Sequence, residues 1–372
     1  MNWFIFCLVA SFVVNFHENN AQSRCGCKTI RPCYKEMLGK LLDRDEAGCI
    51  EDAAIGASTV TIFLKAIREY CGKFLTLVTD HMTFEGRHLY EVVLSAEKQG
   101  SRTDQHDPNQ PKPVIIIEAG QTGGSEPVGL ALFVVEQLVA CEENEDLLRR
   151  VTWVVLPCTN PDGQEYSRFS QAPWKKNLRQ FVDQLSYGVD ITRNFDVHWN
   201  SVICEKADSS FSQTYPGPAV SSENETKFIK AVIAKHRQNA KVYLSLKGDG
   251  HAILYPYAHT AENRRNTTQL RRVAGELAAR VNQRASGVHI FDNRSIFDAD
   301  GKPHCGHSVD YAYENGVPLA YEMRVFLGSD NAIMSMFQQM PRGYDTSLRN
   351  GYFSGIRELF NVLTNEKKYG KI

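Results

Sequence analysis

Apolar runs of strand length alternate with helical patterns along much of the chain. Strand-like runs lie at residues 114–117, 151–156 and 242–246, and apolar positions recur at helical spacing at residues 128–140, 223–237 and 268–282. Strands interleaved with helices predict an α/β fold, in which a central mixed, mostly parallel twisted sheet is covered by helices on both faces, giving three α/β/α layers. Ligands of such sheets bind beyond the carboxyl ends of the strands, where Gln121 and Lys247 fall.

The first third of the chain has its own pattern. Apolar positions at residues 60–78 recur at helical spacing, and residues 89–94 indicate a strand. The polar stretch at 100–113 predicts a surface loop within one domain. Four cysteines at residues 24–55, around a short helical pattern, predict a small disulfide-tied N-terminal segment.

The chain begins with an apolar run, residues 3–14, that is too short to span a bilayer and is followed by small residues typical of a cleavage site. We therefore expect residues 1–23 to be a removed signal peptide and the protein to be secreted without a membrane anchor. Sequons at Asn224, Asn266 and Asn293 fit this route and predict a glycoprotein.

Charge and cysteine content narrow the possible functions. The net charge is -1, so the overall charge gives no support for nucleic-acid binding. Nine cysteines remain after the leader, and an oxidising compartment would pair most of them, leaving an odd one free or bridging two molecules. The position of Cys158 at the end of an apolar run favours a small buried side chain over a reactive thiol.

Several short strings follow one another in a definite order. After Gln121-Thr122-Gly123-Gly124-Ser125-Glu126 come Asn160-Pro161-Asp162-Gly163, Trp174-Lys175-Lys176-Asn177, Gly188-Val189-Asp190, Arg193-Asn194-Phe195, Tyr255-Pro256-Tyr257 and Ser308-Val309-Asp310. Their order and spacing resemble the zinc carboxypeptidases of the A/B type from about residue 56 to about residue 366. The resemblance implies a carboxypeptidase-like domain at 56–366, preceded by the segment 24–55 and followed by a short tail at 367–372.

The resemblance also indicates where a metal would bind. The family holds zinc through a His, a Glu three residues later and a second His, and these positions fall on Gln121, Gly124 and Lys247. None of the three supplies a usual zinc donor. We therefore expect no metal and no cofactor here, and a displaced ligand such as Glu126 is the alternative.

Glu322 matches the family's catalytic Glu if the chain is two residues shorter after Gly316-Val317; an ungapped alignment would place Arg324 there instead. An ammonium in the place of a metal dication can neutralise a remaining carboxylate. We therefore predict a Lys247–Glu322 ion pair in place of the metal centre, with Glu322 as a vestigial catalytic residue. The alternative is that Lys247 extends into a water-filled cleft.

Four further residues match substrate-binding positions of the family. Arg193 matches the arginine that binds the C-terminal carboxylate of the substrate, a task that suits a planar guanidinium. Thr192 stands where the family has Asn, and Lys175 where it has the arginine that polarises the scissile carbonyl. Val309 takes the pocket-floor position, which would favour apolar or aromatic C-terminal residues.

His304-Cys305-Gly306-His307 is the tightest His/Cys cluster in the sequence and raises the possibility of a relocated metal site. In a secreted chain Cys305 is more consistent with a disulfide, and two His residues are too few for a usual zinc site.

These features predict a secreted carboxypeptidase-like pseudoenzyme that binds peptides or proteins with free C-termini. One alternative is an active zinc metallocarboxypeptidase, engaged in proteolysis through displaced ligands. A second is a structural or interaction protein that does not use its cleft.

Overall fold

The computed structural model describes residues 25–96, 111–170, 174–181, 185–199, 201–204, 209–262, 267–285, 291–326, 344–370 and 372. The predicted signal peptide, most of the predicted loop at 100–113 and the Asn266 sequon lie outside these residues. Within the described part of the chain, no helix has the length and apolar character needed to cross a membrane.

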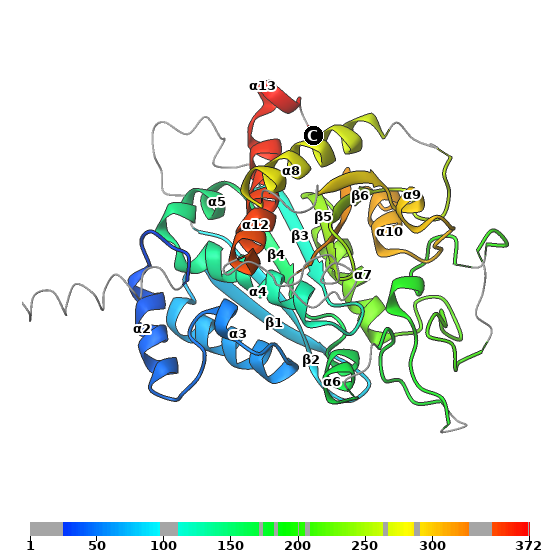
Figure 1. Ribbon diagram of the computed structural model, residues 1–372, viewed down its shortest axis with the longest axis horizontal. Helices are drawn as coiled ribbons and strands as arrows, with labels where there is room; N and C mark the ends of the chain where they lie inside the picture. Colours follow the sequence, from blue (N-terminus) through cyan, green and yellow to red (C-terminus); the bar gives the residue numbers. More distant parts are fainter. Residues whose placement is uncertain are drawn as a thin grey trace, which may run out of the picture.

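An eight-stranded mixed sheet forms the centre of the molecule (Figure 1). Its strand order is β1-β2-β4-β3-β5-β8-β6-β7. Neighbouring strands are parallel in the pairs β4–β3, β3–β5, β5–β8 and β6–β7, and antiparallel in the other three. The strands are β1 (Leu75–Met82), β2 (His88–Leu94), β3 (Val114–Ala119), β4 (Thr152–Leu156), β5 (Ala240–Lys247), β6 (Ala252–Tyr255), β7 (Asp292–Ser295) and β8 (Leu319–Arg324).

Helices cover both faces of the sheet, so the predicted three-layer α/β fold is confirmed. The larger core lies under α2 (Pro32–Leu42), α3 (Ala57–Cys71), α4 (Ser125–Ala140), α5 (Glu145–Arg150), α8 (Thr268–Arg284) and α12 (Tyr344–Thr364). The smaller core lies under α7 (Asn224–His236), α9 (Ile296–Asp300) and α10 (Ser308–Glu314). The described part of the chain also contains the α-helices α6 (Pro161–Ser170) and α13 (Glu366–Tyr369) and short 3-10 helices at Ile50–Asp52, Glu142–Asn144 and Ile191–Arg193.

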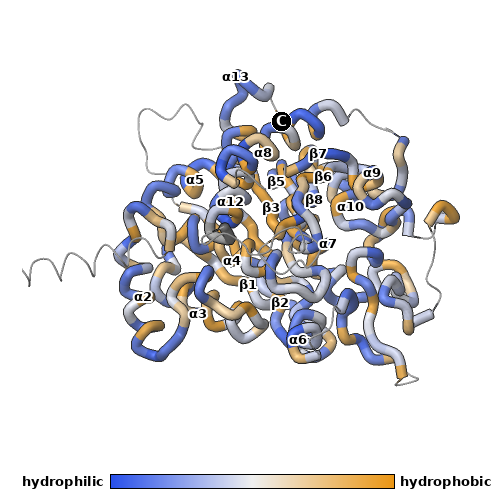
Figure 2. Tube along the Cα trace, viewed as in Figure 1, coloured by the Kyte–Doolittle hydropathy of each residue, from blue (hydrophilic) through white to orange (hydrophobic). Residues whose placement is uncertain are grey.

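The alternation of side chains along the strands explains why both faces are apolar. In β3, Ile115 and Ile117 pack in the larger core, whereas Val114 and Ile116 pack in the smaller one. Strands that are buried on both faces read as continuous apolar runs, which is the pattern that marks β3, β4 and β5 in the sequence. Figure 2 shows this as hydrophobic colouring along β3 and β5, in contrast to the hydrophilic α13.

One element prediction is wrong. The helical pattern at residues 60–78 covers two elements, since α3 ends at Cys71 and β1 begins at Leu75. Phe74, Leu75, Leu77 and Val78 continue the apolar spacing by chance, and periodicity alone does not separate a helix from a short strand that follows it closely.

The Cys-rich segment at residues 24–55 packs against the larger core. Cys25 pairs with Cys49 inside the segment, while two further disulfides, Cys27–Cys141 and Cys33–Cys71, attach it to the rest of the chain. Tyr34, Met37, Leu41 and Ile50 belong to that core. The segment is therefore integrated with the main body of the described structure.

The fourth disulfide joins Cys204 to Cys305, which confirms the sequence-based expectation for Cys305. Cys158 is the one free cysteine among the described residues, and it is buried as predicted. Burial raises the pKa of the Cys158 thiol, and nearby carboxylates including Glu165 raise it further. The thiol is therefore neutral and a poor nucleophile.

Candidate functional site

Polar side chains gather at the carboxyl ends of three neighbouring parallel strands. Glu118 of β3 pairs in register with Ser245 of β5, which pairs with Glu322 of β8. Two residues further on, Lys247 pairs with Arg324. Successive side chains of a strand point to opposite faces, so these residues share the face covered by α7 and α10. The strands thus position one continuous polar row at the sheet edge where α/β folds bind ligands.

Glu118 is fully buried and anchors one end of this row. One carboxylate oxygen accepts hydrogen bonds from Gln121 Nε2 at 2.7 Å and Ser245 Oγ at 2.8 Å, and the other accepts from Thr159 Oγ1 at 2.7 Å. Burial raises the pKa of Glu118, and these hydrogen bonds oppose the rise. The site therefore has a fully satisfied polar floor.

Gln121 lies directly above that floor and is almost fully buried. Its amide nitrogen also donates to Ser308 Oγ at 2.9 Å, and its backbone oxygen accepts from Asn160 Nδ2 at 3.0 Å. Its side-chain oxygen has no hydrogen-bond partner among the described residues. The buried amide is thus held in place through its nitrogen.

The turn after Gln121 is closely packed against the loop before Lys175. A Cβ added at Gly123 would lie 2.6 Å from the backbone oxygen of Trp174 and 2.7 Å from that of Gly163, so no larger residue fits there. Gly124, the next residue, is the N-cap of α4 and has no side chain to offer the cleft.

Lys247 and Glu322 form the predicted ion pair. Lys247 Nζ lies 2.7 Å from Glu322 Oε2, and the two side chains are 13% and 0% exposed. Arg324 Nε contacts the other carboxylate oxygen at 2.6 Å. Burial by itself would raise the pKa of Glu322, but Lys247 and Arg324 hold it well below its usual range. Glu322 is therefore a buried carboxylate bound by two cations.

His307 adds a third donor to Glu322. The backbone N–H of Val309 donates to His307 Nδ1 at 3.2 Å, so the ring carries its proton on Nε2. Nε2 lies 2.9 Å from Glu322 Oε2 and 2.8 Å from Lys247 Nζ. Burial, followed by the charge of Lys247, lowers the pKa of His307, which keeps the imidazole neutral. Lys247 and His307 thus converge on one oxygen of Glu322.

The ion pairs continue outward from Glu322. Arg324 Nη2 lies 2.5 Å from Asp300 Oδ1, and Asp300 Oδ2 lies 3.5 Å from His304 Nδ1. Burial would raise the pKa of Asp300, but His304 and Arg324 lower it strongly. Burial lowers the pKa of His304 to about 3, against the opposing effect of Asp300. Asp300 is therefore ionised and His304 neutral near pH 7.

Arg193 stands at the far side of His304. His304 Nε2 lies 3.1 Å from the backbone oxygen of Thr192, whose hydroxyl donates to Asp190 Oδ1 at 2.6 Å. Asp190 Oδ2 lies 3.3 Å from Arg193 Nε. Among the described residues, Arg193 Nε is buried without a hydrogen bond beyond this ion-pair contact, no hydrogen bond involves the two terminal nitrogens, and the side chain is 15% exposed. The geometry therefore leaves the outer part of this guanidinium available to a ligand.

The backbone around Arg193 is fixed by close packing with Gly306. A Cβ at Gly306 would lie 2.2 Å from the backbone oxygen of Arg193, and Gly306 has the positive φ of 72° that glycine adopts readily. Phe195 N donates to Gly306 O at 3.1 Å. Arg193 is thus held on a rigid loop, and the Cys204–Cys305 disulfide adjoins it.

Lys175 and Val309 lie apart from this network. Lys175 is exposed, and among the described residues its one hydrogen bond is made by the backbone N–H, to Gln213 Oε1 at 3.5 Å. Val309 is fully buried in the smaller core with Ile191 and Ala312. Their proposed roles in substrate binding stay predictions.

The sequence analysis did not single out Glu118 or Asp300, although both belong to the site. Glu118 had a detectable signal, because a lone carboxylate in an otherwise apolar strand needs partners. Asp300 had none, since its neighbours Arg324 and His304 meet it only in the folded chain. The rings of His304 and His307 lie in contact, with centroids 4.7 Å apart. They contact Asp300 and Glu322, respectively, and so belong to the polar network around Glu322.

Several known proteins are similar to this chain. Zinc carboxypeptidase A 1 of Drosophila melanogaster is 33% identical over 257 residues, which cover 67% of this chain and 56% of that protein. Carboxypeptidase B of Helicoverpa zea is 30% identical over 267 residues, covering 70% of this chain and 59% of that protein. The chain therefore spans little more than half the length of these two relatives.

Solved structures show the same fold. Carboxypeptidase A from Helicoverpa armigera superimposes with a TM-score of 0.73 at 22% identity, over 90% of this chain and 80% of that one. Bovine thrombin-activatable fibrinolysis inhibitor, in complex with tick carboxypeptidase inhibitor, gives a TM-score of 0.72 at 17% identity, over 84% of this chain and 98% of that one.

These relatives correct the expectation that no cofactor belongs here. The Drosophila protein is named a zinc carboxypeptidase, so zinc is the cofactor that the relationship implies. The expectation that the chain has no cofactor is therefore wrong as far as its relatives are concerned. The residues at the matching positions nevertheless do not fit the ion. Gln121 offers an amide oxygen, Gly124 no side chain, and the Lys247 ammonium has no lone pair.

Elsewhere in the described part of the chain, the one cluster of potential metal donors is Cys25, Cys49 and Glu136, and the two sulfurs form a disulfide. A disulfide offers no thiolate to a metal.

The residues Gln121, Gly124 and Lys247 at the zinc-ligand positions do not change the evidence that the chain shares the sequence and fold of these relatives. A family model described as zinc carboxypeptidase matches residues 60–344, well over half of the sequence. This chain belongs to the zinc carboxypeptidase family.

Proposed function

We propose that this protein is a secreted, catalytically inactive member of its family that binds the C-terminal carboxylate of peptides or proteins at Arg193. The observation that carries the proposal is the contact of 2.7 Å between Lys247 and Glu322. It places an ammonium on the carboxylate that resembles the family's catalytic base.

Glu322 is poorly suited to act as a general base in this arrangement. It is fully buried, and Lys247, Arg324 and His307 all contact its two oxygens. The charges of Lys247 and Arg324 and the hydrogen bond from His307 lower the pKa of Glu322 against the effect of burial, and a carboxylate with a strongly lowered pKa has little tendency to take a proton from water. Peptide hydrolysis through Glu322 would therefore be negligible.

Arg193 is, by contrast, suited to bind an anion. Asp190 contacts only its Nε, which leaves the two terminal nitrogens for a ligand. A guanidinium can form two parallel hydrogen bonds with a carboxylate. The packing against Gly306 fixes the backbone of Arg193, so little order is lost when a ligand binds.

Secretion is supported by the oxidised state of the cysteines. Eight of the nine described cysteines form disulfides, which persist in oxidising compartments. The predicted signal peptide at residues 1–23 provides the route.

The test is a binding assay with the full secreted protein and a pair of fluorescent peptides that differ only at the C-terminus. We expect saturable binding of the peptide with a free carboxylate and little binding of its amide. Replacement Arg193→Ala should weaken binding about 10- to 100-fold, since hydrogen bonds to charged groups contribute about 1.5–3 kcal/mol. Peptides with apolar, acidic and basic C-terminal residues would test the preference that Val309 predicts.

Arg294→Ala is the matched control. Arg294 Nε contacts Asp292 at 3.2 Å, much as Arg193 contacts Asp190, but it lies on the edge strand β7. Equal binding of the free-acid peptide and the amide would contradict the carboxylate anchor. Release of the C-terminal residue, assayed with and without added zinc, would show an active enzyme instead. A reducible dimer that binds neither peptide would favour an interaction protein.

A further inference from the structure

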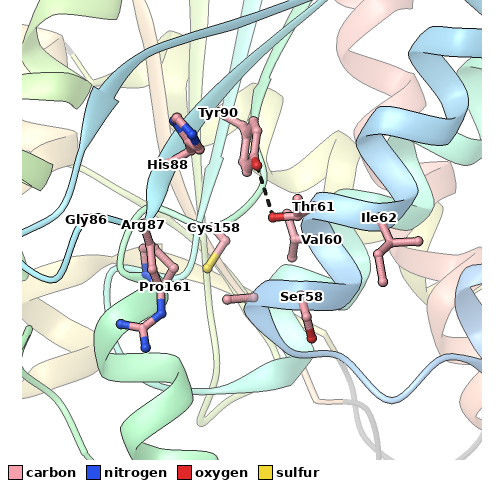
Figure 3. Close-up of a pocket in the computed structure, with 11 residues that line it drawn as sticks. Ser58, Val60, Thr61, Ile62, Gly86, Arg87, His88, Tyr90, Cys158 and Pro161 are labelled. Atoms are coloured by element: carbon pink, nitrogen blue, oxygen red, sulfur yellow. Dashed lines mark hydrogen bonds between the residues drawn. The ribbon is translucent and has the colours of Figure 1, made fainter.

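A hollow of about 320 Å³ lies between the start of α3, the start of β2 and the start of α6 (Figure 3). Its lining includes Val60, Ile62, Tyr90, Cys158 and Pro161. This volume is at the lower end of the range of about 300–1,000 Å³ that is usual for small-molecule sites. The hollow is separate from the ion pairs around Glu322.

A single short segment lies between the hollow and the polar site at Glu118 and Gln121. Cys158 and Pro161 line the hollow, whereas Thr159 donates to Glu118 and Asn160 to the backbone of Gln121. The two sites therefore share one stretch of backbone.

The walls of the hollow are mainly apolar, with a few polar groups. Val60, Ile62 and Pro161 supply apolar surface. Thr61 Oγ1 and Tyr90 OH form a hydrogen bond of 3.0 Å at one side, as Figure 3 shows. Each hydroxyl has further hydrogen-bonding capacity, because a hydroxyl both donates and accepts. Apolar walls with a small number of polar groups are typical of ligand sites.

The charges around the hollow favour an uncharged ligand. Arg87 is the cation in the lining, and it already pairs with Glu85 and with the buried Asp162. Next to the lining, Ala57 N donates to Glu165 Oε1 at 2.5 Å, and Arg168 pairs with Glu165 at 2.8 Å. These carboxylates and arginines neutralise one another, so no unpaired positive charge among the described lining residues would attract an anion.

We propose that this hollow is a binding site for a small uncharged aromatic molecule that carries a hydroxyl group. The ring contacts Val60, Ile62 and Pro161, and the hydroxyl joins the Thr61–Tyr90 hydrogen bond. This assignment does not depend on the function proposed for the cleft.

The probe for the test is 2-naphthol, with 2-naphthoate as its anionic counterpart, titrated into the full-length protein by calorimetry. We expect saturable 1:1 binding of 2-naphthol and binding of 2-naphthoate that is at least about tenfold weaker. Thr61→Val keeps the shape but removes the hydroxyl, and should weaken 2-naphthol binding severalfold. Ser58→Trp, at the exposed rim, should abolish it by filling the mouth.

Lys65→Trp is the matched control, because Lys65 is exposed on the same helix but outside the lining. It should bind 2-naphthol like the unmodified protein. A second measurement, independent of variants, is the midpoint of thermal unfolding, which saturating 2-naphthol should raise because it binds the folded protein. The proposal is overturned by any of three results: no saturable binding up to about 1 mM, equal binding of both probes, or binding that Ser58→Trp leaves unchanged.

Discussion

Glu322 and Glu136 are both fully buried carboxyl groups, yet their surroundings drive them in opposite directions. Glu322 contacts Lys247 and Arg324, and its pKa lies well below the usual range. Glu136 accepts hydrogen bonds from Tyr34 OH at 2.6 Å and Ile50 N at 3.1 Å, and burial raises its pKa to about 8. Burial therefore makes the charged form of each carboxyl group less favourable, and the neighbouring groups determine whether the carboxyl group is ionised.

The largest expected effect comes from replacing Glu322 with Gln. The variant leaves the partly buried Lys247 and Arg324 without the fully buried carboxylate that they share, and removing one partner of a buried ion pair costs about 3–5 kcal/mol. Urea unfolding at pH 7 measures the loss. Glu366→Gln, at an exposed position, is the control and should change stability by less than about 0.5 kcal/mol. An equally small effect of Glu322→Gln would mean that the pair is not buried.

Glu136→Gln should change how stability depends on pH. The pKa of Glu136 rises from 4.5 to about 8 on folding, so the folded state holds one proton more than the unfolded state between these values. Its contribution to stability is therefore present below about pH 4.5 and is lost as the pH rises towards 8, by about 1.4 kcal/mol per pH unit.

A Gln at this position can accept both hydrogen bonds at the oxygen that Tyr34 and Ile50 contact, and it does not ionise. The variant should therefore gain stability relative to the unmodified protein across this pH window. Parallel curves of unfolding free energy against pH for the two proteins would show that Glu136 is not protonated in the fold.

Lys247→Met should have an intermediate effect, of about 1–3 kcal/mol at pH 7, because Arg324 and His307 still contact Glu322. The pKa of Glu322 is lower in the folded state than in the unfolded state. The resulting stability is fully present at pH values above the unfolded-state pKa and is lost as the pH falls through the folded-state pKa. Without Lys247 that loss should begin at a higher pH. Acid unfolding followed by circular dichroism measures the midpoint.

Lys235→Met provides the control for an exposed lysine. Lys235 contacts the buried Glu91 at 2.8 Å, but its own side chain is 52% exposed. Water screens the exposed ammonium of Lys235, and His236 still contacts Glu91 at 2.8 Å, so this variant should lose less than Lys247→Met, about 0–1 kcal/mol. The reverse order would contradict the assignment of Lys247 to the buried network.

The smallest effect is expected for Tyr34→Phe. It removes one hydrogen bond to Glu136 and leaves the bond from Ile50 N, for a loss of about 1 kcal/mol in the free energy of unfolding. The loss should be similar at pH 5 and pH 7, where Glu136 is protonated. A loss above about 3 kcal/mol would show that Glu136 depends on Tyr34 for more than one hydrogen bond.

The succession of apolar runs and helical patterns was sufficient to predict the α/β fold and its layers. It also placed Lys247 at the carboxyl end of a strand, because Lys247 follows an apolar run, whereas Glu322 was found through the family resemblance. Spacing did not separate α3 from β1, since apolar residues continue across their junction.

The rest of the site depends on contacts between distant segments. His307 reaches Glu322 because its ring caps α10 through Val309 N, and no local pattern specifies that geometry. Asp300 lies beside Arg324 only once β8 has paired with β6 and α9 has packed nearby. Such networks are specified by the tertiary structure, so motif matching finds some of their members and misses others.

The disulfides have a consequence for how this protein responds to cleavage by a protease. Cys27–Cys141 spans 114 positions and Cys204–Cys305 spans 101. A single cut of the backbone inside either span yields two pieces that stay covalently joined, and no fragment is released until the bond is reduced. A nicked molecule would thus keep its intact mass, apart from one water, on a non-reducing gel and separate only under reduction.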